Sequence, residues 1–328
     1  MWGSISFIHE YKRAVLALVV LSVAAFYGAA IAYPVGHLDR DGGALPYAGV
    51  THVAAIDDPM IEIASVFDLG PTMDRAGFVL KPIRRGDALV PRLFVENLPE
   101  DFNAPMAIEQ RKQTFIRTVL PLILKANEEV RSERGQLMAL EEQVSSGLEI
   151  PEEAQLWLDN LAEKYRASSN DFTTLLRRVD TVSPTLALAQ SIEESGWGRS
   201  RFSRLGNALY GQRVWSKGGG FVPEERGEEE KFEVRAFDSL FESVRSYVVN
   251  LNRHYAYEGY RAERSRMRSG KTPFDGRRLS GTLISYSERR EAYVESLAGL
   301  IEGNRLWQFE NAQLSSEPVN KDILLAAR

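Results

Sequence analysis

The chain has 328 residues, of which 26% are charged and 44% hydrophobic, and its formal net charge is −5. This is the composition of an ordinary globular protein, and it disfavours a nucleic-acid partner, which normally requires a basic surface. The sequence contains no cysteine, which excludes disulfides and thiolate metal sites, and its four histidines lack metal-ligand spacing. We therefore expect neither a metal nor a cofactor.

The N-terminal region contains an uncharged, almost wholly apolar run from Ala14 to Tyr33, directly after Lys12 and Arg13. A membrane-spanning helix needs about 20 such residues, and the positive-inside rule keeps the preceding residues in the cytoplasm. A cleaved signal peptide is the alternative, because Ala30-Ile-Ala32 offers a small-x-small cleavage site. Both interpretations place the rest of the chain beyond the membrane.

The next segment, residues 34–57, is rich in glycine, proline and aspartate and predicts a tether. From Ile61 to Asn97, short β-prone runs are broken by glycine and proline, which predicts a small β-containing region. At the other end of the chain, residues 315–328 are expected to be peripheral. The β-prone runs cover residues 61–63, 78–80 and 93–95.

Helical patterns dominate from Pro105 onward. A long amphipathic stretch begins there and contains Pro121, which predicts a kink. Two β-prone segments, 207–215 and 231–237, flank a glycine-rich turn and an acidic run and predict a β-hairpin lobe. Mostly helices around one small β-lobe is an α+β architecture. The other expected helices cover residues 152–165, 171–179, 183–195, 239–257 and 288–301.

The helix at 183–195 can be derived from its own residues. Ser183 is a good N-cap, Pro184 suits the first turn, and Gly196 supplies the stop. A helix of this length with these end signals places its last side chains at the edge of the core. The residues of interest are therefore those in its final turn.

The packing face of this helix is an apolar stripe of Leu188, Ala189 and Ile192. Glu194 lies two residues past Ile192, roughly 200° around a helix that turns about 100° per residue. Its side chain is therefore expected to point away from the packing face. Glu193 lies only one step off the stripe and is the competing carboxylate.

The carboxylic acid Glu194 stands beside the aromatic Trp197, a combination that suggests a sugar polymer as substrate. Hydrolysis of a glycosidic bond needs an acid that stays protonated near neutral pH, and a partly apolar cleft provides this. The alternative is a solvated carboxylate at a helix end. A helix C-terminus disfavours negative charge, which makes that alternative an unusual structural choice.

Several strings in the right order resemble the family 73 β-N-acetylglucosaminidases, which cleave bacterial peptidoglycan and include the flagellar peptidoglycan hydrolase. The likeness is strongest to the Bax-type envelope proteins of this family. It covers residues 108–305 and implies a lysozyme-like fold. The matching strings are Glu194-Ser-Gly-Trp-Gly198 preceded by Ala189-Gln190, Gly206-Asn-Ala-Leu-Tyr-Gly211, Tyr286-Ser-Glu-Arg-Arg-Glu-Ala-Tyr293, Arg111 to Leu122 and Gly220-Phe-Val-Pro223.

The resemblance implies roles for individual residues. Glu194 corresponds to the general acid, and Tyr293 would hydrogen-bond near the scissile bond. The expected substrate-binding residues are Gln190, Trp197, Asn207, Tyr210 and Tyr286. Core packing is the alternative for each aromatic side chain, and the two amide side chains could instead hold the loop after the helix.

A second carboxylate would act as base or nucleophile, depending on whether it lies farther from the first than about 5 Å or near that distance. We select Glu228, by register from the matched Gly220-to-Pro223 string. Its neighbours Arg226 and Gly227 depart from the threonine-rich string of the family, and the acetamido group of the substrate could replace it. The other candidates are Glu224, Glu225, Glu229, Glu230 and Glu233.

The sequence is thus interpreted as an endo-β-N-acetylglucosaminidase acting on the glycan strands of peptidoglycan. The alternatives are a catalytically silent, envelope-anchored scaffold that binds peptidoglycan, and a muramidase or lytic transglycosylase of the same fold.

The expected partners are the glycan strands and, through residues 14–33, the membrane, with no nucleic acid. The chain would lie in the bacterial inner membrane facing the periplasm, or in the periplasm if the N-terminal segment is cleaved. The expected parts are a cytoplasmic stub with an anchor or signal peptide at 1–33, a tether with a small β-containing region at 34–104, a lysozyme-like domain at 105–310 and a tail at 311–328.

Overall fold

The computed structural model describes residues 58, 60–214, 218–222, 232–284, 286, 289–320 and 322–323. The apolar run at 14–33 and the expected tether at 34–57 lie outside these residues, as does Glu228. None of the helices within the described ranges combines the length and the apolar character that a bilayer crossing requires. The membrane segment therefore stays a prediction.

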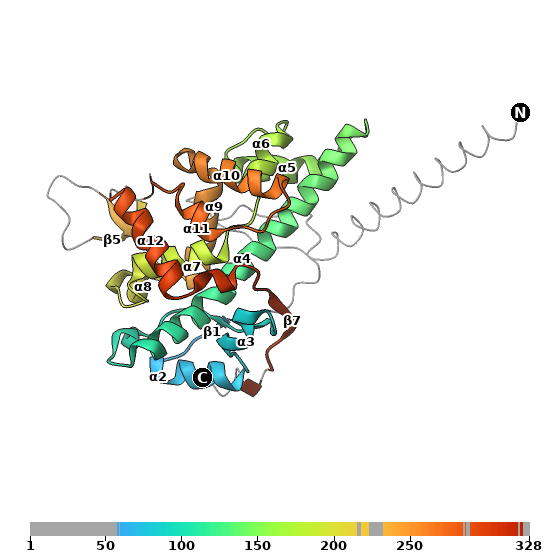
Figure 1. Ribbon diagram of the computed structural model, residues 1–328. Coiled ribbons are helices and arrows are strands. Elements are labelled where there is room, and N and C mark those ends of the chain that lie inside the picture. Colours follow the sequence, from blue (N-terminus) through green and yellow to red (C-terminus); the bar gives the residue numbers. More distant parts are fainter. Residues whose placement is uncertain are drawn as a thin grey trace, which may run out of the picture. The chain divides into compact units, whose positions relative to one another are not determined.

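The chain divides into two compact units, and the division after Gln136 falls within the sequence of the long helix α4 (Ile108–Ser145), which Figure 1 labels. The described part of the smaller unit covers residues 137–172. It contains the last turns of α4 and the helix α5 (Glu152–Tyr165), which starts after Pro151 as the sequence predicts. The helix α5 ends at Arg166, which takes the left-handed conformation at φ 53°.

The larger unit is made of the described residues within 56–136 and 173–328. It is mostly helical with small sheets, which confirms the predicted α+β class. After α4 and α6 (Phe172–Arg178), its elements are α7 (Pro184–Ser195), α8 (Arg201–Gly206), β4 (Arg213–Val214), β5 (Gly220–Phe221), β6 (Glu233–Arg235), α9 (Leu240–Arg253), η3 (Tyr255–Tyr257), α10 (Glu258–Ser269), α11 (Gly276–Ser280), α12 (Glu291–Gly303), η4 (Leu306–Phe309) and β7 (Leu314–Pro318).

The region before α4 contains two helices that the sequence does not predict. The β-prone run at 78–80 is not a strand, because Leu80 begins a helix. The first of the two helices starts where the Ser65 side chain accepts a hydrogen bond from the Phe67 N–H, a cap that outweighs the β-prone pattern around it. The elements are β1 (Met60–Ile61), α2 (Val66–Arg75), α3 (Leu80–Arg85), β2 (Val90–Arg92), β3 (Phe94–Val95) and η2 (Glu100–Asn103), with β1 and β3 paired in parallel.

The first residues of the expected peripheral tail are instead part of the larger unit. Strand β7 pairs in parallel with β2, more than 200 residues earlier in the chain. Arg92, the last residue of β2, has a buried side chain that links β2 to Asp58 and to β7. Its guanidinium donates to both carboxylate oxygens of Asp58, at 2.7 and 2.6 Å, and to the Ser315 carbonyl at 3.4 Å.

The β-lobe forms a three-stranded antiparallel sheet in the order β4-β6-β5, which confirms the predicted lobe in its described part. Gly220 lies so close to β6 that a Cβ atom there would stand 1.9 Å from the Val234 carbonyl oxygen. Gly206 ends α8, and a Cβ atom there would stand 2.4 Å from the ring of Phe221. The lobe is therefore packed directly on α8.

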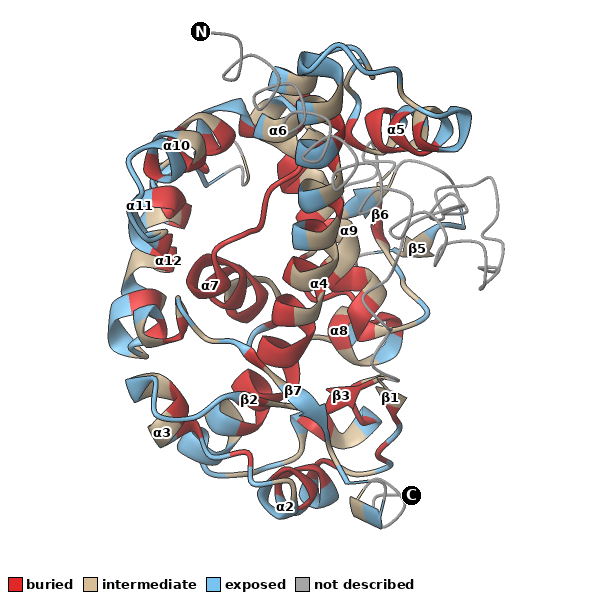
Figure 2. Ribbon diagram, turned by 90° about the vertical axis from the view of Figure 1, so that its right-hand side faces the viewer, coloured by how far each residue is buried: buried red, intermediate tan, exposed pale blue. Residues whose placement is uncertain are grey.

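Helix α7 lies in the core and contacts α11, α12 and η4. The sequence predicts one apolar face, but every residue from Pro184 to Ile192 is buried (Figure 2). The polar side chains on its other faces are hydrogen-bonded, which lowers the cost of burying them. The Thr185 hydroxyl donates to the Leu306 carbonyl at 3.2 Å, and the Ser191 hydroxyl donates to the Leu188 carbonyl at 2.8 Å.

One buried arginine fixes the segment that leads into α7. The guanidinium of Arg264, on α10, donates to the carbonyls of Arg177, Asp180 and Thr181 at 3.0 to 3.1 Å. It also donates to Asn252 Oδ1 at 2.6 Å. A planar group with five N–H donors can satisfy this many acceptors, whereas an ammonium group cannot.

We expect Arg264→Lys to lower the free energy of unfolding by about 2–4 kcal/mol, because buried carbonyls lose their donors. The matched control is Arg266→Lys on the same helix, where the side chain is exposed and pairs with Glu263. That change should cost less than about 1 kcal/mol. Urea denaturation of both variants checks the difference, and equal losses would contradict the role given to Arg264.

Candidate active site

The last turn of α7 is shaped by the residues of the signature string. Ser183 caps the first turn as predicted, and Gly196 ends the helix in the left-handed conformation at φ 57°. Trp197 and Gly198 follow with φ 60° and 76°, so the chain turns sharply away from the helix. A Cβ atom at residue 198 would stand 2.8 Å from the ring of Phe102. Glycine is therefore required by space at residue 198, and at residue 196 it is favoured by the left-handed backbone.

A chain of hydrogen bonds leads from the core to Glu194. The Tyr247 hydroxyl on α9 donates to Gln190 Oε1 at 2.7 Å, and Gln190 Nε2 donates to the Tyr293 hydroxyl oxygen at 2.9 Å. Tyr293, on α12, is itself hydrogen-bonded to Glu194. Because the Tyr293 oxygen already accepts the amide proton, its own proton is left for the Glu194 carboxylate, and this interaction lowers the pKa of Glu194.

The environment of Glu194 favours its protonated form. Burial raises the pKa of Glu194 to about 7, while the hydrogen bond from Tyr293 opposes the rise. The negative charge of Glu193 also raises this pKa, and the positive charges of Arg289 and Arg213 lower it. A carboxyl group with such a pKa is protonated in a large fraction of molecules at neutral pH, as a general acid must be.

The neighbouring carboxylate, Glu193, is committed to structural contacts. It pairs with the guanidinium of Arg289 and accepts a hydrogen bond from the Ser296 hydroxyl at 2.8 Å. Both of its oxygens are thus used to attach α7 to α12 and the turn before it. This arrangement favours Glu194 over Glu193 as the reacting group, in agreement with the register of the signature string.

The second matched string packs against the Glu194 carboxyl group. A Cβ atom at Gly211 would stand 2.8 Å from Glu194 Oε2, and Gly211 has φ 58°, so both space and backbone conformation require glycine. Just before it, Asn207 ends α8 at φ 51° and donates through Nδ2 to Asn97 Oδ1 and the Phe237 carbonyl, at 2.7 and 3.0 Å. Asn207 therefore holds the loop, as one of the two alternatives proposed.

The predicted sugar-binding aromatic residues differ in their exposure. Tyr210 is only 2% exposed and stacks on Tyr247 with ring centroids 3.8 Å apart, so it packs in the core. Tyr286 is partly exposed and stacks parallel to Tyr293 at 5.5 Å. Trp197 is also partly exposed, with its ring edge-to-face against Phe115. Trp197 and Tyr286 thus keep part of their surface exposed, although Tyr286 also packs against Tyr257 and donates its hydroxyl proton to the Tyr210 carbonyl at 3.2 Å.

Two buried tyrosines of this region, Tyr257 and Tyr247, are absent from the set of site residues predicted from the sequence. Tyr257 packs against Tyr286 at 5.6 Å, and burial raises its pKa, to which the charge of Glu194 contributes. Gln190 belongs to the predicted set, but it is fully buried and positions Tyr293, so its amide does not face solvent. Tyr247, its partner on α9, is likewise missed by the sequence, where its helical spacing marks it only as a core residue.

Most candidates for the second carboxylate lie outside the described residues. Glu228 and the candidates Glu224, Glu225, Glu229 and Glu230 lie outside the described residues, so Glu228 stays a prediction. Glu233 is described and buried. Its carboxylate accepts the Gly218 and Gly220 N–H groups at 3.1 and 3.0 Å and so stabilises the turn of the β-lobe. Across the described ranges, no group of three histidine, aspartate or glutamate side chains could hold a metal ion.

The similarity of this chain to known proteins includes the residues of this site. A family model named Glucosaminidase, described as mannosyl-glycoprotein endo-beta-N-acetylglucosaminidase, matches residues 169–306. The chain is also 30% identical over 201 residues to the protein Bax of Escherichia coli (strain K12), a match that covers 60% of this chain and 70% of that protein. The chain belongs to the family 73 glucosaminidases. No solved structure matches it.

The glucosaminidase match contains the whole hydrogen-bonded chain from Tyr247 to Glu194, together with Gly211. It begins at residue 169, just before α6, and therefore excludes α4, α5 and the small sheets and helices before α4. The family resemblance inferred from the sequence strings is confirmed. Parts of the larger unit, β2 and β7 among them, lie outside this match.

The raised pKa of Glu194 predicts a specific dependence of stability on pH. Because the folded-state pKa of about 7 exceeds the ordinary value of 4.5, the folded protein holds a proton that the unfolded chain releases. This contribution to stability is present below pH 4.5 and is lost as the pH rises through 7. Relative to Glu194→Gln, the wild type should lose roughly 1–3 kcal/mol between pH 4.5 and 8.

Urea denaturation at several pH values measures this difference. Glu295→Gln, at an exposed position on α12, supplies the matched control and the baseline. If the stability difference between wild type and Glu194→Gln is the same at pH 4.5 and pH 8, Glu194 is an ordinary solvated carboxylate.

Proposed function

We propose that this chain is an endo-β-N-acetylglucosaminidase that hydrolyses the glycan strands of peptidoglycan, with Glu194 as the general acid. Membership of the glucosaminidase family supports a peptidoglycan-related glycosidase. The observation that carries the finer proposal is the buried Glu194 carboxyl, which is hydrogen-bonded by Tyr293 and has a pKa near 7. A protein that only binds glycan has no need for such a group.

In the proposed reaction, Glu194 gives its proton to the glycosidic oxygen while the bond from that oxygen to the sugar C1 breaks. Positive charge develops on the sugar ring, and water then adds at C1. The hydroxyl of Tyr293 keeps its hydrogen bond to the carboxylate that Glu194 becomes, which lowers the energy of that charge. Gln190 holds the Tyr293 hydroxyl in the orientation that this hydrogen bond requires.

The group that assists the attack on C1 is proposed separately. Glu228 is our choice for a base or nucleophile, and the acetamido group of the substrate is the alternative. Trp197 and Tyr286 are proposed to contact sugar rings, because both are partly exposed. Trp197 follows Glu194 by three residues, and Tyr286 stacks on Tyr293, which interacts with Glu194. The lysozyme-like fold inferred from the family resemblance is likewise part of this proposal.

The first test compares two neighbouring carboxylates. Glu194→Gln keeps the shape of the side chain but removes the proton donor, and general acid catalysis is typically worth about 10² to 10⁴ in rate. We expect at least a 100-fold loss in the release of soluble fragments from purified peptidoglycan. Glu193→Gln, the matched control, should lose less than about tenfold. Retention of more than roughly a tenth of the activity by Glu194→Gln would exclude it as general acid.

The second test identifies the bond that is cleaved. An N-acetylglucosaminidase creates new reducing ends that are N-acetylglucosamine, and borohydride reduction followed by mass spectrometry identifies them. Reduced N-acetylmuramic acid would indicate a muramidase, and a 1,6-anhydro product would indicate a lytic transglycosylase. If the protein sediments with peptidoglycan but produces no new ends, it is a binding scaffold.

We further propose that residues 14–33 anchor the chain in the bacterial inner membrane, with the glucosaminidase region in the periplasm. The support is the apolar run itself, preceded by Lys12 and Arg13. A chain that starts at Pro34 should be soluble, and the full-length chain should stay with membranes after a high-salt wash. Membrane retention of the shortened chain would refute a single anchor, and a mature protein that begins after Ala32 would indicate a signal peptide.

A further inference from the structure

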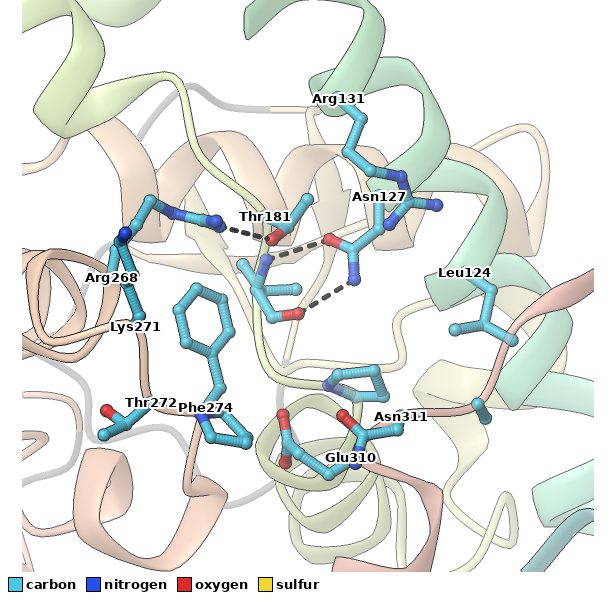
Figure 3. A pocket seen from close by; sticks show the side chains of 14 residues that line it. Leu124, Asn127, Arg131, Thr181, Arg268, Lys271, Thr272, Phe274, Glu310 and Asn311 are labelled. Atoms are coloured by element: carbon cyan, nitrogen blue, oxygen red, sulfur yellow. Dashed lines mark hydrogen bonds between the residues drawn. The ribbon is translucent and has the colours of Figure 1, made fainter. Parts of the chain in front are cut away.

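A cavity of about 480 Å³ lies at the N-terminal end of α7, the end opposite Glu194. An α-helix of this length places its two ends roughly 16 Å apart, so the cavity is separate from the candidate active site. Figure 3 shows Asn127 and Arg131 on one side of the cavity, Arg268 and Phe274 on the other, and Glu310 below them.

The floor of this cavity contains a carboxyl group with an unused oxygen. Glu310 Oε2 accepts a hydrogen bond from the Ser183 hydroxyl at 2.7 Å. Glu310 Oε1 is buried and has no hydrogen-bond partner among the described residues. Burial raises the pKa of Glu310 to about 7, against the opposing effect of the Thr185 and Ser183 hydroxyls. A buried oxygen of this kind is costly unless a donor reaches it.

The walls carry two cations that the described part of the chain leaves unpaired. The side chains of Arg131 and Lys271 line the cavity, and neither makes an ion pair or hydrogen bond with a described residue, although the charge of Glu128 lies near enough to act on Arg131. Arg268 differs from them, because its guanidinium is held by Asp180 at 2.5 and 2.7 Å and lies over the ring of Phe274. Two positive charges thus remain available to a ligand.

The rest of the lining is apolar or already satisfied. The Asn127 side chain exchanges two hydrogen bonds with the backbone of Val182, at 2.8 and 2.9 Å, and so offers little to a ligand. The apolar contact surface comes from Leu124, Val182, Pro184, Phe274 and Ala312. A volume of this size fits a small organic molecule or a short peptide.

We propose that this cavity binds a short peptide that carries both a free amine and carboxylates. The amine donates to Glu310 Oε1, and the carboxylates pair with Arg131 and Lys271. A neutral sugar would leave the two cations unmatched, whereas a ligand with only negative charge would be repelled by ionised Glu310. Only a ligand that carries both an amine and carboxylates matches Glu310 and the two cations, Arg131 and Lys271, at the same time.

The peptides attached to the glycan strands of peptidoglycan have this chemistry, since they contain carboxylates and, with a diamino acid, a free amine. Assigning the cavity to them rests on the proposed function. The cavity would then recognise the peptide of a strand, while Glu194 acts on the glycan. The binding step can be measured with a free peptide and needs no cleavage.

Isothermal titration calorimetry of the full chain with L-alanyl-γ-D-glutamyl-meso-diaminopimelate tests the proposal. We expect saturable binding that Glu310→Gln weakens about tenfold or more and that Arg131→Gln and Lys271→Gln each weaken about threefold or more. Arg277→Gln, an exposed position that pairs with Glu302 outside the cavity lining, is the control and should leave binding unchanged. Acetylation of the diaminopimelate amine should weaken binding as much as Glu310→Gln does, whereas acetylation of the N-terminal amine, which is acylated in a strand, should leave it unchanged.

Three results would overturn the proposal: no saturable binding, binding that all three cavity variants leave unchanged, or equal binding of the peptide acetylated at the diaminopimelate amine. Because Arg131 and Lys271 are exposed, their variants keep the test valid even if Glu310→Gln fails to fold. The all-L isomer, L-alanyl-γ-L-glutamyl-LL-diaminopimelate, carries the same two amines and three carboxylates and separates the sources: equal binding would overturn the link to peptidoglycan. Cleavage of glycan strands stripped of peptides tests Glu194 independently.

Discussion

The arrangement of the candidate active site depends on one chain of interactions, from Tyr247 through Gln190 and Tyr293 to Glu194. Its members come from three helices, α9, α7 and α12, so the carboxyl group is positioned only when all three are packed. Gln190 can serve as the link because α7 is buried on all sides up to its last turn. A buried amide must satisfy both its oxygen and its nitrogen, and here each has a tyrosine partner.

The same constraint explains the glycines of the family strings. The chain must leave α7 immediately after Glu194, and Gly196 and Gly198 allow this through positive φ values. Gly211 must approach the carboxyl group itself, where a Cβ atom would collide with Oε2. The surroundings of Glu194 are therefore dense, and this density is what raises its pKa. Sequence motif, backbone conformation and acidity are consequences of one close-packed turn.

Local signals predicted the parts of the fold that local forces determine. Ser183 and Gly196 bound α7, and Pro151 precedes α5, because caps and proline act within a few residues. The strings around Glu194 also indicated the carboxyl group that we propose as the general acid. What they could not show is the direction of a buried polar side chain, since the partners of Gln190 lie 57 and 103 residues later in the chain.

Long-range contacts account for the other differences from prediction. Parallel pairing of β7 with β2 joins two segments that are more than 200 residues apart in the sequence, and neither strand has a sequence pattern that indicates the other. The family resemblance made Tyr210 a candidate sugar platform, with core packing as the alternative, and its ring stacks on Tyr247 inside the core. Glu233 belongs to an acidic run that looks solvated, yet its carboxylate binds two backbone N–H groups of a turn. In each case a tertiary partner decides between core and surface.

The central claim is that Tyr293 tunes and orients Glu194 as a proton donor. The dependence of kcat/KM on pH, measured for wild type and Tyr293→Phe, tests it most directly, because the alkaline limb reports the acid of the free enzyme. The account predicts a limb near pH 7 in the wild type. It predicts a shift to higher pH in Tyr293→Phe, since the lost hydrogen bond stabilised the carboxylate, together with a lower maximum rate. An alkaline limb at the same pH in both proteins would contradict it.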